Sequence, residues 1–74
     1  MPPNEIDARG LLCPLPVLKL RKRIAALAPG EEIRLIATDP AAVIDVPHYC
    51  AEAGHELVRM EEGEGETMYV VRKG

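Results

Sequence analysis

The chain has 74 residues and a mass of 8.1 kDa, which allows one small domain over residues 1–74. A chain of this length buries only about 60% of its unfolded surface, which excludes a separate cofactor domain and a deep enclosed pocket. Hydrophobic residues make up 47% and charged residues 28%, so the chain is neither disordered nor fibrous. A net charge of −3, two Tyr, no Trp and no Phe argue against stable nucleic-acid binding.

The cysteine count and the first residues indicate the cellular compartment. Cys13 and Cys50 are too few for a secreted scaffold held together by disulfides. The amino-terminal stretch has neither the basic nor the apolar region of a signal peptide. No apolar run approaches the roughly 20 residues that span a bilayer. We therefore expect a cytoplasmic protein with free thiols and no membrane association.

The first half of the chain predicts a strand and then a helix. Residues 5–9 form a short first strand, which ends before Gly10. Residues 14–28 form the most clearly patterned helix, because its apolar residues recur at helical spacing. Pro29-Gly30 ends this helix. The apolar face consists of Val17, Leu20, Ile24, Leu27 and Ala28.

The middle of the chain predicts a second strand and a second helix. Residues 32–38 are rich in β-branched side chains and indicate a strand. Asp39 and Pro40 then supply an N-cap and a first-turn proline. Pro47 should kink or restart this helix, with Asp45 capping its second part, and Gly54 ends it. The apolar face consists of Val43, Val46, Cys50 and Ala53.

The last third of the chain predicts two antiparallel strands. Residues 55–62 and 67–73 form a hairpin around Gly63-Glu64-Gly65. The resulting order is βαβαββ, and right-handed crossovers place both helices on one face of the sheet. The expected fold class is an α/β (α+β) two-layer sandwich with a four-stranded mixed sheet.

Cys13 is the first candidate for chemistry, because it lies between a strand, a glycine turn and a helix N-terminus. The unpaired N–H groups and the dipole at a helix N-terminus favour an anion, which predicts a lowered thiol pKa at Cys13. Pro14 and Pro16 fix the backbone beside it. The neighbouring surface is predicted to be cationic, through Lys19, Arg21, Lys22 and Arg23. The alternative is that Cys13 is an ordinary buried residue, and the spacing alone leaves both interpretations open.

The other candidates favour structural roles. Cys50 lies on the apolar face of its helix, so core packing is favoured over a resolving thiol. His48 and His55 match no zinc-binding spacing with the two cysteines, and we predict no metal site and no cofactor. A Cys–His nucleophile would need a histidine near Cys13 in space. Asp45 is expected to be a helix cap rather than an acid catalyst.

Charge is unevenly distributed along the chain. The amino-terminal half is basic and the carboxy-terminal half is acidic, although the net charge is small. Such segregation indicates either two solvated faces or a docking surface that is basic around Cys13. The basic docking candidates are Arg9, Lys19, Arg21, Lys22 and Arg23.

The residues around Cys13 carry a family resemblance. Asp7-Ala8-Arg9-Gly10-Leu11-Leu12-Cys13-Pro14-Leu15-Pro16 resembles the Cys-Pro-X-Pro signature of the TusA/SirA-like sulfur carriers. The likeness continues through Asp39-Pro40-Ala41, Asp45-Val46-Pro47, Cys50 and Arg72-Lys73-Gly74. Apolar Leu15 departs from many members involved in tRNA thiolation, which carry an acidic residue there.

The resemblance implies a βαβαββ fold and a persulfide relay. Cys13 would be the sulfur carrier, and Gly10, Pro14 and Pro16 would position it. The donor would be a cysteine desulfurase or rhodanese, and the acceptor a DsrE-like or other sulfur-relay protein. Destinations in the family are tRNA 2-thiouridine synthesis, molybdenum-cofactor assembly and sulfur oxidation. We expect a monomer, and whether such a sulfurtransferase acts as an enzyme stays open. The alternative is a non-catalytic interaction or regulatory module of the same fold.

Overall fold

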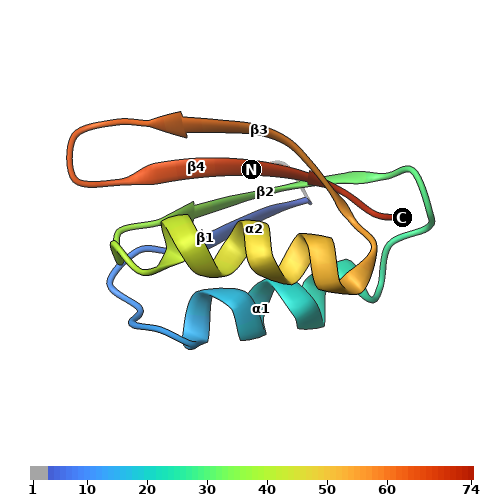
Figure 1. The fold of residues 1–74 in the computed structure, drawn as a ribbon, viewed down its shortest axis with the longest axis horizontal. Coiled ribbons are helices and arrows are strands. Elements are labelled where there is room, and N and C mark those ends of the chain that lie inside the picture. The colour runs from blue at the N-terminus through green and yellow to red at the C-terminus, as the bar shows by residue number, and fades with distance from the viewer. Residues whose placement is uncertain (1–3) are drawn as a thin grey trace.

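The computed structural model describes residues 4–74 as a four-stranded sheet with two helices on one face (Figure 1). Residues 1–3, part of the stretch expected to carry no signal peptide, lie outside the described residues. The βαβαββ order and the two-layer sandwich are confirmed, and each predicted strand agrees with the observed one to within a residue. The elements are β1 (Glu5–Ala8), α1 (Leu15–Ile24), β2 (Glu32–Ala37), α2 (Ala42–Ala53), β3 (Glu56–Glu62) and β4 (Thr67–Arg72).

The sheet is mixed, with the strand order β1-β2-β4-β3. β1 and β2 are parallel, whereas β4 runs antiparallel to both β2 and β3. α1 packs against β1 and β2, and α2 against β3 and β4. Because β1 and β2 are parallel, the loops that follow them leave the same end of the sheet, and both helices begin there (Figure 1). This topology brings residues 9–14 next to residues 38–41.

The core lies between the sheet and the two helices. Buried and exposed side chains alternate along β2, so that one face of the strand points into this core. Ile33, Leu35 and Ala37 face the helices, while Arg34 is exposed on the other face. Ala28, at the end of the predicted helix face, is exposed. The predicted helix positions Leu20, Ile24, Val46 and Cys50 are buried, Val17, Leu27 and Val43 are half-buried, and Ala53 is exposed.

α1 ends at Ile24 instead of reaching residue 28 as predicted. After Ile24 the chain tightens into a turn, in which the Leu27 N–H donates to the Ile24 carbonyl oxygen (3.1 Å). The ammonium group of Lys73 donates to the carbonyl oxygens of Ala25 (3.3 Å) and Leu27 (2.6 Å). A side chain distant in the sequence therefore caps the carbonyl groups of the turn that follows α1.

α2 differs from its prediction at its start and at Pro47. The helix begins at Ala42, because Asp39 first forms a turn in which its carboxylate accepts from the Ala41 N–H (3.2 Å). Of the kink or restart predicted at Pro47, the restart is wrong, since α2 continues through Pro47 as one helix (Figure 1). Gly54 ends the helix as predicted, with a φ of 79° that glycine adopts readily.

Candidate functional site

Cys13 lies in the turn before α1, and its side chain is an exposed free thiol. The loop that carries it is tied to the start of α2. The Gly10 N–H donates to the Thr38 hydroxyl (2.9 Å), and the Cys13 N–H donates to the Asp39 carboxylate (2.5 Å). Gly10 has a φ of 80°, which other residues rarely adopt. The backbone of Cys13 is therefore held by hydrogen bonds rather than left free in a flexible loop.

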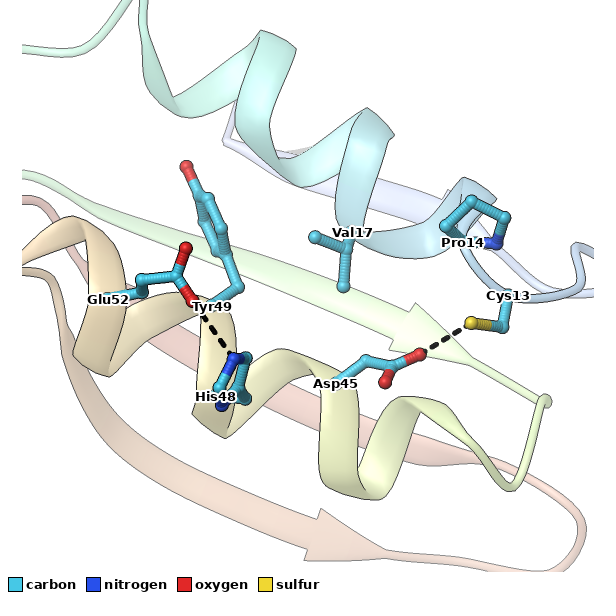
Figure 2. Close-up of a pocket in the computed structure, with 7 residues that line it drawn as sticks. All are labelled: Cys13, Pro14, Val17, Asp45, His48, Tyr49 and Glu52. Carbon is cyan, nitrogen blue, oxygen red and sulfur yellow. Dashed lines mark hydrogen bonds and ion pairs between the residues drawn. The ribbon is translucent and has the colours of Figure 1, made fainter.

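Cys13 faces a shallow groove between the two helices (Figure 2). The groove has a volume of about 260 Å³. Its α1 side consists of Cys13 with Pro14 and Val17, and its α2 side consists of Asp45, His48, Tyr49 and Glu52. Pro14 is exposed along the groove, whereas Pro16 is buried under the first turn of α1. The groove is open to solvent, so a large partner can reach the sulfur atom.

The closest contact of the Cys13 thiol is with Asp45, in the first turn of α2. Cys13 Sγ donates to Asp45 Oδ2 over 2.7 Å (Figure 2). The two residues are 32 positions apart in the sequence, and the fold alone brings them together. The predicted capping role of Asp45 is wrong, because α2 has no side-chain cap and the carboxylate reaches the thiol instead.

The carboxylates of Asp45 and Asp39 favour the neutral form of Cys13. The hydrogen bond to Asp45 raises the pKa of the Cys13 thiol, with smaller contributions from desolvation and from the negative charges of Asp45 and Asp39. The sequence predicted a lowered pKa from the start of α1. That prediction is wrong, because two carboxylates lie near the sulfur and both favour the neutral thiol.

The remaining groove residues leave Cys13 without a histidine partner. His48 shares the groove, but its Nε2 atom pairs with the Glu52 carboxylate at 2.9 Å on the exposed side of α2 (Figure 2). Within residues 4–74, no three His, Cys, Asp or Glu side chains gather so that they could hold a metal ion. Cys50 is a core residue as predicted, and burial raises the pKa of its thiol.

The five basic candidates have different surroundings. Arg9 pairs with Asp7 (3.0 Å) and reaches Glu66 (3.8 Å), so its charge is largely compensated. Arg21 lies beside Tyr49 and Glu52, and Arg23 is exposed near the end of α1. The other two, Lys19 and Lys22, lie beside exposed apolar side chains in what we call the Leu–Lys surface, formed by Leu11, Leu15, Leu18, Lys19 and Lys22. Their role in docking stays a prediction.

Sequence reasoning did not assign Asp39 to the site, and this residue makes a testable contribution to stability. Asp39→Ala removes the acceptors of the Cys13 and Ala41 N–H groups. Lost hydrogen bonds of this kind cost about 1–2 kcal/mol of the free energy of unfolding. Urea unfolding measures the loss, and Asp39→Asn, which keeps an acceptor oxygen, should retain more of the stability. Equal stability of Asp39→Ala and wild type would contradict the proposed tethering.

The fold and the site define a class of protein: a small α+β domain that presents one exposed cysteine where two helices begin. The family model described as "Sulfurtransferase TusA" matches residues 4–73. The chain therefore belongs to the TusA family. No helix in residues 4–74 is long and apolar enough to cross a membrane.

Relatives with assigned names cover nearly the whole chain. The "Sulfur carrier protein TusA" of Pseudomonas paraeruginosa is 46% identical over 68 residues, which are 92% of this chain and 86% of the relative. The protein of the same name from Pseudomonas aeruginosa PAO1 gives the same values. The protein of that name from Pseudomonas entomophila is 44% identical over 68 residues, 92% of this chain and 85% of the relative. The family resemblance inferred from the residues around Cys13 is thereby confirmed.

Proposed function

We propose that the protein is a sulfur carrier that holds a sulfane sulfur on Cys13 as a persulfide. The observation that carries this proposal is the position of Cys13, an exposed free thiol on a tethered turn. The chain belongs to the TusA family, and the relatives described above are named sulfur carriers. Gly10, Pro14 and Pro16 position the cysteine and take no part in the chemistry.

The proposed reaction is an exchange between a thiol and a persulfide. The Cys13 thiol first loses its proton to solvent, and its thiolate attacks the terminal sulfur of a donor persulfide. A new Sγ–S bond forms, the S–S bond of the donor breaks, and the donor thiolate leaves and takes up a proton. Delivery repeats these steps with an acceptor thiolate as the attacking group. No net oxidation occurs, and the step requires neither a metal nor a cofactor.

The partners that we propose follow from membership of the TusA family. A cysteine desulfurase or a rhodanese supplies the sulfane sulfur, and a DsrE-like or other sulfur-relay protein accepts it. The final destination is tRNA thiolation, molybdenum-cofactor assembly or sulfur oxidation. A monomer in a reducing cytoplasm suits this role, since the thiol must stay free and the same groove must serve both partners in turn.

The Leu–Lys surface is the proposed docking site for these partners. Leu15 and Leu18 are about half exposed on α1, and the positive charge of Lys22 lies beside them. We expect Lys22→Glu to slow sulfur transfer to an acceptor several-fold at low salt and to weaken the salt dependence. Arg34→Glu, on the far face of the sheet, is the matched control. Rates of sulfur transfer should be measured for both variants across a salt series. If both substitutions slow transfer equally, the Leu–Lys surface is not the docking site.

Loading with a small sulfane-sulfur donor tests the proposed function. After incubation, the intact mass should rise by one sulfur atom, and a thiol reductant should remove it. Wild-type protein that gains no sulfur under conditions that load a known carrier would refute the proposal.

A second candidate function is a non-catalytic interaction or regulatory module. One observation favours it: the raised pKa of Cys13, since a carrier thiol needs thiolate character. A module of this kind would bind its partners through the same surfaces, gain no sulfur and react slowly with alkylating reagents. The loading experiment separates the two functions directly.

A further inference from the structure

The hydrogen bond between Cys13 and Asp45 is unexpected for a sulfur carrier. The attacking species in thiol exchange is the thiolate. Asp45 Oδ2 accepts from Cys13 Sγ at 2.7 Å, an interaction that only the protonated thiol can provide. The thiolate would instead face a carboxylate at this distance, and the two negative charges repel each other. The groove therefore stabilises the form of Cys13 that does not attack.

We propose that Asp45 is a positioning residue that holds the Cys13 thiol in its protonated form and delays formation of the nucleophilic thiolate. The consequence is a carrier that reacts slowly with adventitious oxidants and alkylating reagents in the absence of a partner. This proposal deepens the proposed function, but its effect on Cys13 ionisation holds whether or not the protein carries sulfur.

The surroundings of Cys13 support this assignment. Asp45 approaches from α2, and Asp39 from the turn before α2 binds the Cys13 backbone. Farther along the groove, His48 and Glu52 pair with each other. The α1 side adds only Pro14 and Val17, neither of which carries a charge. The raised pKa of the thiol has the Asp45 hydrogen bond as its largest cause.

Asp45→Asn tests the proposal by removing the charge while keeping the shape of the side chain. The amide can donate to a thiolate, so Cys13 should ionise at lower pH, with a midpoint about one pH unit or more below that of wild type. At a pH below the midpoint, such a decrease raises the thiolate fraction about tenfold but lowers the intrinsic reactivity of the thiolate about threefold. The net expectation is that Cys13 reacts roughly threefold faster at neutral pH in this variant than in wild type.

The measurement is the rate of iodoacetamide alkylation of Cys13 as a function of pH. In this reaction the thiolate displaces iodide and forms a stable S–C bond, which mass spectrometry of the Cys13 peptide detects. Asp45→Glu, which keeps a carboxylate, should restore a midpoint close to wild type. Glu64→Gln removes the same charge from an exposed position in the β3–β4 turn and should leave the profile unchanged.

The alkylation profiles of the variants decide whether Asp45 holds the Cys13 thiol in its protonated form. A profile displaced to lower pH in Asp45→Asn, and not in Glu64→Gln, supports the proposal. An unchanged or higher midpoint in Asp45→Asn would overturn it, and Asp45→Ala supplies the same test if the first variant does not fold. Loading from a small donor should also be faster in Asp45→Asn. If wild type gains no sulfur while the alkylation profile of Asp45→Asn still moves to lower pH, the carrier function fails and the role of Asp45 stands.

Discussion

Cys13→Ser should abolish sulfur loading, whereas Cys50→Ala should load as wild type does. The serine hydroxyl does not ionise near neutral pH and cannot hold sulfur as a persulfide. Cys13 is exposed beside the groove, while Cys50 is 2% exposed within the core. Both variants should be incubated with the same small donor, and intact mass then reports the number of added sulfur atoms.

Controls make this comparison specific to Cys13. Circular dichroism and urea unfolding should show that Cys13→Ser is folded, because its side chain contributes little buried area. Alanine is preferred over serine at Cys50, since a buried hydroxyl without a partner would destabilise the core. Loading of Cys13→Ser together with failure of Cys50→Ala would show that the carrier thiol has been assigned to the wrong residue.

Leu20→Ala should destabilise the fold by about 2–5 kcal/mol, the usual cost of removing a large aliphatic side chain from a core. Leu20 is fully buried on α1, against the sheet. A domain of 74 residues has a free energy of unfolding of roughly 4–11 kcal/mol. This single change therefore removes a large share of the stability, and the urea midpoint should fall well below that of wild type.

Leu18→Ala is the matched control for this prediction. Leu18 lies on the same helix and is 47% exposed, so the change in helix propensity is identical and only the burial differs. We expect the free energy of unfolding to change by about 0.5 kcal/mol or less. The midpoints and slopes of urea unfolding give the free energy of unfolding of both variants. Equal losses in the two variants would mean that α1 does not pack on the sheet as described.

Local patterns in the sequence predicted most of the fold. The apolar spacing around Leu20 and Val46 gave both helices and their buried faces. Gly54 and the glycines at 63 and 65 marked the end of α2 and the hairpin correctly. Apolar spacing and turn glycines affect only the segment in which they lie. They can therefore be recognised in a single sequence.

The wrong predictions concern features of the structure that depend on residues distant in the sequence. The turn after α1 is capped by Lys73, 46 to 48 positions away from the carbonyl groups that it binds. The charge state of Cys13 depends on Asp45, 32 positions away. A helix N-terminus alone favours a thiolate, but two carboxylates from another segment reverse that preference. Their presence in the family resemblance, as Asp39-Pro40 and Asp45-Val46-Pro47, was the signal that could have drawn attention to them.

The central claim is that Cys13 receives a sulfur atom and passes it on. Its most direct test is to load the protein with isotopically labelled sulfur, remove the donor and add an acceptor thiol protein. Peptide mass spectrometry then locates the label over time. We predict that the label is first found on the Cys13 peptide, and that its loss there matches its gain on the acceptor. Label that never occupies Cys13, or that stays there when the acceptor is present, would contradict the proposed relay.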